Sequence, residues 1–362
     1  MKKKIIINTF LFLLSCLFSL VIFEFLALKI SKYNKSDFEF DETNFNERYV
    51  KFREQPLNLN LEIYPNPNSL KKNNLENKKY IFRTDEEGFI LPTQNNKSPD
   101  YEIFFLGGST MENRYVDEGL RFPFLVGQNL NKKCQSKFKT YNLGRSKNNS
   151  IHSLNLLINK VLKFRPKYVV IMHNINDYIQ FLYGDNFYWN DSDRQILSNN
   201  VNFNLRKYLK SKIYDYFPVT MIQINNLRER FISNNTIRNN IENYTELNTS
   251  EYDTQYLKMI KTFHAFSEIY EFNLVYLVQP HDIRDLDYSD HLINQNSFND
   301  VLRSFVENIE TDERPYLIDL DTKFTNKADL FYDDVHVNNN GSIEISNFIT
   351  ESLIKNFRFK GC

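Results

Sequence analysis

The sequence predicts an α/β fold around a parallel sheet of five strands, preceded by a separate apolar helix. Two patterns predict the sheet. The segments between the expected strands are long enough to hold crossover helices, which neighbouring parallel strands require. Five short runs are mostly apolar, as strands covered on both faces are: residues 103–106, 141–143, 168–172, 274–278 and 316–320. The separate helix is predicted from one apolar run near the N-terminus.

That apolar run covers residues 5–30 and follows three lysines. A helix of roughly 25 residues is about 38 Å long, which exceeds the ~30 Å hydrocarbon layer of a bilayer. A cleavable signal would have a shorter apolar stretch and a small-residue exit site. We therefore predict an uncleaved signal anchor over residues 1–31, which makes the chain a single-pass membrane protein. The alternative, a lipoprotein cleavage box ending at Cys16, is disfavoured because about ten apolar residues follow that cysteine.

We expect the remainder of the chain to lie outside the cytoplasm, in the periplasm or at the cell surface. Lys29, Lys32 and Lys35 nearly balance the leading lysines, so the positive-inside count is only weakly asymmetric. Residues 32–100 are polar, rich in Asn and Lys and interrupted by prolines, which indicates a stalk followed by an ordered lead-in near residues 81–84.

A main domain is predicted over residues 101–357. It contains a polar and aromatic segment at about 179–254 that a minimal five-stranded sheet does not need. Two interpretations of this insertion remain open. It can lie beside the carboxyl ends of the strands, where open α/β sheets bind ligands, or it can be surface decoration.

Composition excludes several classes of function. Lys+Arg and Asp+Glu both number 45, so net charge gives no support for nucleic-acid binding. The hydrophobic fraction of 41% and the aromatic fraction of 15% require a folded core. No phosphate-binding glycine loop, dinucleotide fingerprint or metal-ligand cluster occurs, so we expect no cofactor and no metal. Of the three cysteines, Cys134 and Cys362 can pair in an oxidising compartment, although the sequence does not establish that they meet.

Polar residues follow four of the predicted strands. Ser109 comes after two glycines, in a turn from which a hydroxyl can project, although such a turn alone is a weak signal. Gly144 ends the second strand, and Asn176 follows the third, where it can donate its amide into a crevice or cap the next helix.

The fourth cluster is the most informative because it pairs a histidine with a carboxylate. Asp333 stands three residues before His336, so its side chain can fold back onto the imidazole in a tight turn. Asp334 is a rival for the same role, and the spacing favours Asp333. His173 and His281 lie near strand ends, where they are either structural or line the site.

Together, the four clusters resemble the blocks of the SGNH, or GDSL, hydrolase superfamily, which carry Ser, Gly, Asn and His in this order. The resemblance is nearest to membrane-anchored bacterial members, whose first block reads Gly-Gly-Ser-Thr, as residues 107–110 do here. The Gln-Pro pair at residues 279–280, after the fourth strand, is also similar to those members. It implies a flavodoxin-like three-layer α/β/α fold. Gly108, Asn174 and residues 147–148 depart from the usual pattern, and the last departure affects the shape of the site beside Gly144.

The resemblance also implies roles for individual residues. Ser109 would be the nucleophile, His336 its general base, and Asp333 the residue that orients His336. The backbone N–H groups of Ser109 and Gly144 and the side chain of Asn176 would bind the oxyanion.

The function expected from this resemblance is a serine esterase that acts on acylated, for example O-acetylated, glycan at the cell envelope through an acyl-serine intermediate. Three alternatives remain open at this point. They are an O-acyltransferase of the same type, a lipid esterase, and a non-catalytic glycan-binding or assembly factor.

Overall fold

The computed structural model describes residues 49–50, 52–65, 74–183, 197–198, 249–282, 295–310 and 314–362, together with eight helical positions between Thr9 and Ile22. The chain divides into two compact units. The larger consists of Val50–Ser198 and Asn202–Cys362, and the smaller of Met1–Tyr49 and Asn199–Val201. The elements of the larger unit carry the candidate site.

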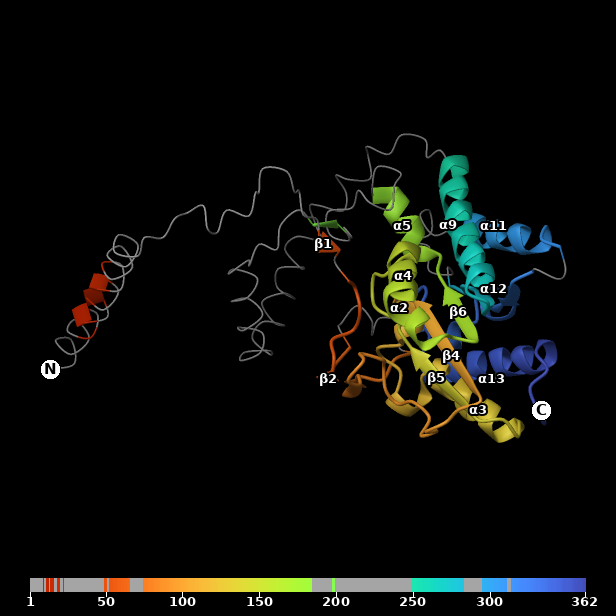
Figure 1. Cartoon of the computed structure of the whole chain (residues 1–362), viewed down its shortest axis with the longest axis horizontal. Coiled ribbons are helices and arrows are strands. Elements are labelled where there is room, and N and C mark those ends of the chain that lie inside the picture. The colour runs from red at the N-terminus through yellow and green to blue at the C-terminus, as the bar shows by residue number, and fades with distance from the viewer. Residues whose placement is uncertain are drawn as a thin grey trace. The chain divides into compact units, whose positions relative to one another are not determined.

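A five-stranded parallel sheet forms the centre of the larger unit (Figure 1). Its strands stand in the order β5-β4-β6-β8-β9, and every neighbouring pair is parallel. Their bounds are β4 Tyr101–Gly107, β5 Phe138–Asn142, β6 Tyr168–Met172, β8 Asn273–Val278 and β9 Tyr316–Asp319. All five predicted strands are confirmed. The first strand of the sheet lies second in space, which is the flavodoxin-like order, and the strand order reverses beside it.

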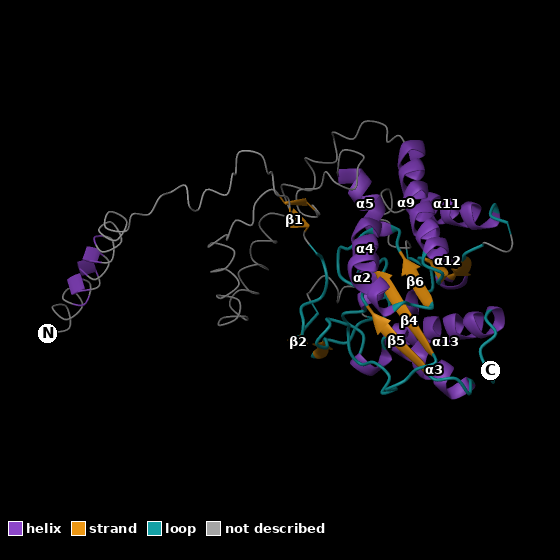
Figure 2. Cartoon of the chain, in the orientation of Figure 1, coloured by secondary structure: helices purple, strands orange, loops and turns teal. Residues whose placement is uncertain are grey.

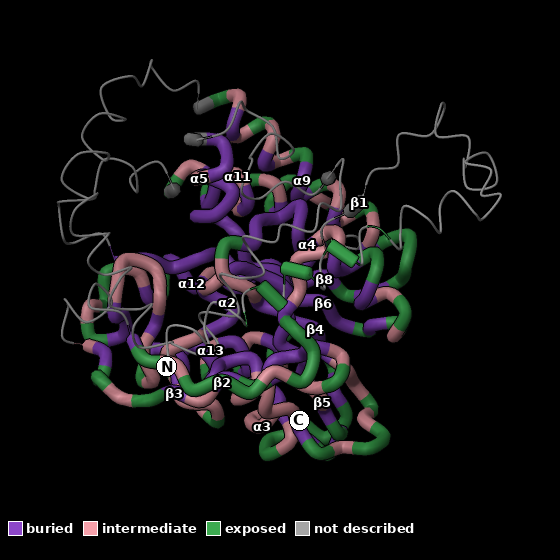
Figure 3. The backbone as a smooth tube through the Cα atoms, turned by 90° about the vertical axis from the view of Figure 1, so that its left-hand side faces the viewer, coloured by how far each residue is buried: buried purple, intermediate pink, exposed green. Residues whose placement is uncertain are grey.

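Side chains alternate along each strand between two hydrophobic cores, one on each face of the sheet. Along β4, Phe104 and Leu106 belong to one core, while Ile103 and Phe105 belong to the other. Because both faces are buried, the three central strands carry runs of successive apolar residues, at 103–106 in β4, 168–172 in β6 and 274–278 in β8, which is the pattern that predicted them. In Figure 3 the strands form the buried centre of the molecule.

Helices cover both faces and complete three layers (Figure 2). One core contains apolar residues of α3 and α13, and the other contains residues of α4, α5, α9 and α11. These helices are α3 Phe122–Lys133, α13 Asn339–Asn356, α4 Ser150–Leu156, α5 Ile175–Tyr183, α9 Thr249–Ile269 and α11 Gln295–Glu307. The predicted three-layer α/β/α architecture is therefore confirmed.

Shorter elements connect these layers. The helix α2 follows β4 directly, and α12 follows β9 directly. The remaining pieces are single turns of 3-10 or π helix and two-residue strands. Their bounds are α2 Ser109–Glu112, α12 Leu320–Phe324, β1 Tyr49–Val50, β7 Leu197–Ser198, the 3-10 turns Glu118–Leu120, Leu162–Phe164 and Ala328–Leu330, and the π turn Leu157–Val161.

Residues 52–65 and 74–100, here called the lead-in, belong to the same compact unit as the sheet. Within it, β2 (Asn60–Ile63) pairs in antiparallel register with β3 (Tyr80–Arg83). The buried guanidinium of Arg121 donates to the carbonyls of Ile81 and Leu91, both at 2.7 Å. The folded unit therefore begins at Val50, and the boundary expected at residue 101 falls inside it.

Two predicted segments lie largely outside the described residues. Most of the expected signal anchor, residues 1–31, and most of the expected insertion, residues 179–254, belong to these segments. At the two ends of the insertion, the chain is helical as the last residues of α5 and the first of α9. Among the described residues, we find no helix with the length and hydrophobicity needed to cross a membrane.

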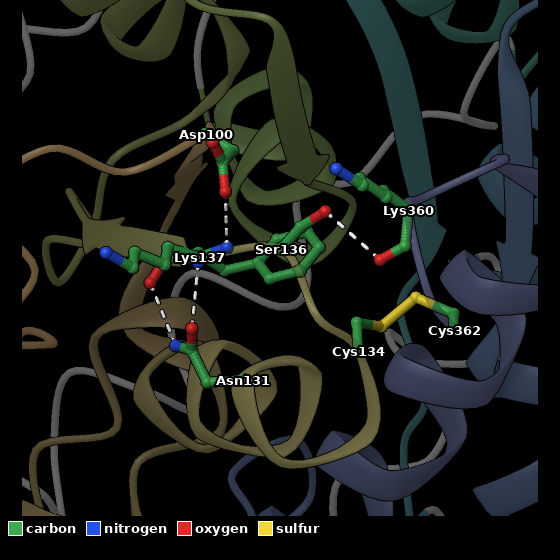
Figure 4. Close-up of a disulfide and its surroundings, with 8 residues drawn as sticks. Asp100, Asn131, Cys134, Ser136, Lys137, Lys360 and Cys362 are labelled. Carbon is green, nitrogen blue, oxygen red and sulfur yellow. Dashed lines mark hydrogen bonds between the residues drawn. A yellow bond between two sulfur atoms is a disulfide. The ribbon is translucent and has the colours of Figure 1, made fainter.

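The C-terminus is fastened to the end of α3 by a disulfide between Cys134 and Cys362 (Figure 4). The bond joins residues that are 228 positions apart. Beside it, both the backbone N–H and the hydroxyl of Ser136 donate to the carbonyl of Lys360. The two cysteines that the sequence left as a possible pair are therefore bonded.

Candidate active site

Ser109, His336 and Asp333 form a continuous hydrogen-bonded chain. The Nε2 atom of His336 is 2.7 Å from Oγ of Ser109. On the other side of the ring, Nδ1 is 2.7 Å from Oδ2 and 2.9 Å from Oδ1 of Asp333. Although 227 positions separate the serine from the histidine, the fold brings the hydroxyl, imidazole and carboxylate into line.

The end of β4 positions the serine. Gly107 is the last residue of the strand, and Ser109 is the first residue of α2. A Cβ on Gly107 would lie 2.7 Å from Cβ of Met111 and 2.9 Å from the carbonyl of Met172, so only glycine fits at this turn. The tight turn brings the start of α2 directly to the carboxyl edge of the sheet, where Ser109 projects.

A tight turn between the 3-10 turn Ala328–Leu330 and α13 positions the histidine. Oδ1 of Asp333 accepts the backbone N–H groups of Val335 at 3.0 Å and His336 at 2.8 Å. The N–H of Tyr332 donates to the carbonyl of His336, which closes the turn. The aspartate therefore holds both the backbone and the ring of its histidine. Asp333, rather than its neighbour Asp334, makes these contacts.

Tyr332, which precedes Asp333 in this turn, also limits movement of the imidazole. The Tyr332 ring stacks on the His336 ring, with centroids 5.5 Å apart and an angle of 8° between the planes. After the turn, the side chain of Asn338 accepts the N–H of Gly341 and caps α13. The histidine therefore stands between a closed turn and the start of α13, one face of which is buried.

Electrostatics in the turn favour a charged pair. Burial lowers the pKa of His336, but Asp333 opposes this through its charge and its hydrogen bond, with smaller contributions from Glu112 and Asp334. The net result is a His336 pKa above its usual 6.5. Burial raises the pKa of Asp333, but the charge and hydrogen bonds of His336 and the turn outweigh it and leave that pKa below its usual value. An imidazole of raised basicity, hydrogen-bonded to a hydroxyl, can accept that hydroxyl's proton.

The amide of Asn176 lies against the backbone just before Ser109. Asn176 is in the first turn of α5, directly after β6. A Cβ on Gly108 would stand 2.3 Å from Nδ2 of Asn176, so the glycine leaves room for this close approach. Nδ2 also donates to the carbonyl of Asn148 at 2.8 Å. The structure thus places the predicted third-block amide beside the predicted nucleophile.

The N–H of Gly144 is arranged differently from the expectation. It donates to Oδ1 of Asn142 at 2.8 Å, because the flanking N–H groups of Leu143 and Arg145 bond to β4 and turn the Gly144 N–H away from that strand. A Cβ at position 144 would meet the α2 backbone, 2.3 Å from the N atom of Glu112. Gly144 is therefore at the site, but its N–H already has a partner in the Asn142 side chain.

The departure at residues 147–148 has a local explanation. Lys147 has a φ of 67°, in the left-handed region that favours glycine. The side chain is exposed, so a lysine is accommodated there without a packing conflict. Asn148, in contrast, is fully buried and hydrogen-bonded through its side chain to Arg53. The loop retains the turn for which a glycine is the usual residue.

The two other histidines near strand ends are buried in the protein interior. Nε2 of His173 is 2.7 Å from the Ser153 hydroxyl, and burial, with a smaller contribution from His152, lowers the pKa of His173 to about 3. His281 is also buried, and its burial lowers its pKa. These observations favour the structural interpretation of both residues. In the part of the chain that the structure describes, no cluster of His, Cys, Asp or Glu could hold a metal ion.

Sequence reasoning did not identify two buried polar residues beside the site, Gln55 and Glu112. Glu112 is the fourth residue of α2, and Gln55 comes from the lead-in. Neither belongs to a motif. The position of Glu112 three residues after Ser109 is the one sequence signal that points toward it, whereas only tertiary contacts bring Gln55 to the site.

Comparison with known proteins gives a likeness in fold. No family model matches the sequence, and no curated protein matches it. Among solved structures, an acetylxylan esterase from Geobacillus stearothermophilus is similar with a TM-score of 0.44 and 13% identity, over 73% of this chain and 97% of that chain. A lipase/acylhydrolase from Enterococcus faecalis is similar with a TM-score of 0.43 and 14% identity, over 72% and 100%.

A third similar structure is a putative lipolytic protein of the G-D-S-L family from Desulfitobacterium hafniense. Its TM-score is 0.40 and its identity 10%, over 70% of this chain and all of that chain. At these values the comparisons do not assign an activity to this chain.

Proposed function

We propose that this chain is a serine ester hydrolase of the SGNH type, in which Ser109 is the nucleophile, His336 the general base and Asp333 the residue that orients it. The observation that supports this most strongly is the pair of 2.7 Å contacts on opposite sides of one imidazole. With Nδ1 donating to Asp333, Nε2 is left as the acceptor for the serine proton. A serine hydroxyl is a poor nucleophile at neutral pH without such a base.

The proposed reaction has two steps. Oγ of Ser109 attacks the ester carbonyl carbon while its proton passes to Nε2 of His336. The tetrahedral intermediate then collapses, and the alcohol leaves with that proton, which forms an acyl-serine ester. In the second step, His336 takes a proton from water, the hydroxide attacks the acyl carbon, and Ser109 leaves with the proton. The products are the free acid and the regenerated enzyme.

The proposed hydrogen-bond donors to the oxyanion of both tetrahedral intermediates are the backbone N–H of Ser109 and Nδ2 of Asn176. The Ser109 N–H belongs to the first turn of a helix, where backbone donors have no intrahelical acceptor. Each well-placed donor typically contributes about 3–4 kcal/mol to lowering the barrier. Gly144 becomes a third donor if the oxyanion draws its N–H from the Asn142 side chain.

For the substrate, we propose an O-acylated glycan of the cell envelope, with the site held outside the cytoplasm by an N-terminal anchor. Two observations support this location. The N-terminal sequence is typical of a signal anchor, and the Cys134–Cys362 disulfide is typical of oxidising compartments. A sugar hydroxyl in place of water would make the same site an acyltransferase. The geometry does not favour a non-catalytic role, for which Ser109 and His336 would be expected to lie apart.

The test uses the full-length protein, with p-nitrophenyl acetate and longer acyl esters as substrates and a fluorophosphonate as a covalent probe. We expect the wild type to release nitrophenol from the acetyl ester, to reject long chains, and to carry the probe on Ser109 in peptide mass spectrometry. Ser109→Ala should lose both activities. Equal nitrophenol release by wild type and Ser109→Ala, or probe attached elsewhere, would overturn the proposal.

A further inference from the structure

Three residues of the lead-in, at positions 53–55, lie against the loop that follows β5; we call them the arm. Nε of Arg53 donates to Oδ1 of Asn148 at 3.0 Å, and Nη2 donates to the carbonyl of Ser146 at 3.2 Å. Nδ2 of Asn148 donates back to the carbonyl of Arg53 at 3.0 Å. The guanidinium of Arg145 donates to the carbonyl of Glu54. The arm and residues 144–148, the oxyanion loop, are therefore joined from both sides.

Gln55 connects this loop to the helix of the nucleophile. Its Nε2 donates to Oε1 of Glu112 at 2.8 Å and to the carbonyl of Gly144 at 2.9 Å. The Gln55 residue is only 6% exposed, so solvent is not a ready substitute for either acceptor. One primary amide thus uses both of its hydrogens to hold α2 and the oxyanion loop together.

The Glu112 carboxylate completes the connection. It is buried, and its Oε2 accepts the backbone N–H of Ser146 at 3.1 Å as well as the Ser146 hydroxyl. A buried carboxylate is costly unless hydrogen bonds satisfy it. The donors from Gln55 and Ser146 meet this need, and they also set the distance between α2 and the loop.

The contacts continue to the amide assigned to the oxyanion. The Asn148 carbonyl accepts Nδ2 of Asn176 at 2.8 Å, while the side chain of the same Asn148 is held by Arg53. Movement of the arm would therefore displace the acceptor that orients Asn176. The same movement would release the Gly144 carbonyl from Gln55.

We propose that the arm is a positioning element of the active site, and that Gln55 is its central residue. The arm holds the oxyanion loop in a fixed place relative to Ser109. Through the contact of Arg53 with Asn148, it also fixes the acceptor of the Asn176 amide. The inference rests on the proposed function for its kinetic consequence. The coupling between the arm and the loop is a physical claim that can be measured separately.

Gln55→Glu is the most direct test because the two side chains have the same shape. The introduced carboxyl has no hydrogen to donate when ionised and only one when protonated, so in either state it cannot serve both the Glu112 carboxylate and the Gly144 carbonyl, as the two amide hydrogens of Gln55 do. We expect kcat to fall by about 10- to 100-fold, since displacing a catalytic group by ~1 Å can cost about 10²-fold. KM should change less, because the arm acts on oxyanion donors rather than on ground-state binding.

Gln94→Glu is a matched control in the same lead-in. Gln94 is also buried, and its Nε2 donates to the carbonyl of Phe124 at 2.7 Å, while Oε1 accepts the N–H of Thr140. The same chemical change there removes the buried donor to α3, keeps the acceptor to β5, and touches neither α2 nor the oxyanion loop. Its melting temperature should fall, and its kcat should stay within about 3-fold of the wild type.

Two further measurements separate positioning from general destabilisation. Below the pKa of the introduced carboxyl, the Gln55→Glu side chain regains a donor, so its activity relative to wild type should rise as the pH is lowered. In hydrogen-exchange mass spectrometry, peptides covering residues 143–149 should exchange faster in Gln55→Glu but not in Gln94→Glu. If either glutamate variant fails to fold, Gln55→Met and Gln94→Met allow the same comparison without added charge.

The outcomes distinguish the two proposals. A wild-type protein without esterase activity or Ser109 labelling would overturn the proposed function, and the exchange measurement would still decide the coupling. Equal effects of the two glutamine variants on kcat in an active enzyme would overturn the arm's catalytic role. Unchanged exchange at residues 143–149 in Gln55→Glu would overturn the coupling itself.

Discussion

Asp333→Asn keeps the shape of the side chain but reverses the polarity of the group that faces His336. Oδ1 of Asp333 accepts the N–H groups of Val335 and His336, so the amide oxygen of the variant is expected to remain at that position. The amide nitrogen then takes the place of Oδ2, which is 2.7 Å from Nδ1 of His336. Since this nitrogen can only donate, Nδ1 must become an acceptor.

The change in tautomer determines the magnitude. When Nδ1 accepts, the ring proton is carried on Nε2, 2.7 Å from Oγ of Ser109, and the imidazole cannot take the serine proton. The corresponding change in a well-studied serine triad lowers kcat by about 10⁴-fold. We expect a loss of about 10³- to 10⁴-fold for Asp333→Asn, which corresponds to about 4–5.5 kcal/mol of barrier.

The assay is p-nitrophenyl acetate hydrolysis by the full-length protein, with thermal melting of each variant to confirm that it is folded. Asp334→Asn is the matched control, because it makes the same change one residue further along. It should retain activity within about 3-fold, since Asp334 contributes only a minor charge effect to the His336 pKa. Equal losses in the two variants, or a larger loss in Asp334→Asn, would refute the assignment of Asp333.

Four other predictions follow from the geometry. His336 must be neutral to act as a base, and its pKa is raised. We therefore expect kcat/KM to increase with pH through a midpoint above 6.5, and a midpoint below 6.5 would contradict the raised pKa. The same raised pKa contributes stability that is complete below about 6.5 and is lost as the pH rises through the folded-state value, which denaturant titrations at several pH values would detect. Cys362→Ser opens a link between residues 228 positions apart and should cost about 2–4 kcal/mol, seen as a melting temperature lower by about 5–10 °C in the absence of reductant; an unchanged melting temperature would show that the bond is not formed. Gly144→Ala introduces a Cβ 2.3 Å from the N atom of Glu112 and should cost about 1–3 kcal/mol and reduce kcat at least ~10-fold, whereas Gly119→Ala, with open space around it, should do neither.

The sheet was predictable from the sequence because burial on both faces requires runs of successive apolar residues, which can be read locally. Each central strand must be apolar at every position, and the segments between strands must be long enough for a crossover. The edge strands follow this pattern only in part, since Lys139 and Asn142 lie in β5 and Asp319 ends β9, and they were found from shorter apolar stretches. The lead-in was harder to predict, because its polar composition resembles a stalk, while a few buried side chains such as Phe82 and Phe89 attach it to the domain.

The short-range part of the candidate site was also visible in the sequence. Asp333 and His336 are three residues apart, so a single tight turn brings them together, and the fold then needs only to supply Ser109. In contrast, the direction of the Gly144 N–H depends on the Asn142 side chain and on pairing with β4, and no spacing rule encodes it.

Contacts between distant segments were decided by tertiary packing alone. Gln55 and Glu112 are 57 positions apart, and neither belongs to a recognisable motif. Their pairing exists because a buried carboxylate requires donors, and the lead-in is the segment that packs where those donors are needed. Local hydrophobic patterns therefore encode the strands, and the spacing of Asp333 and His336 encodes the histidine turn. The contacts of Gln55 and Glu112 with the oxyanion loop follow instead from hydrogen bonds between groups that meet only in the folded chain.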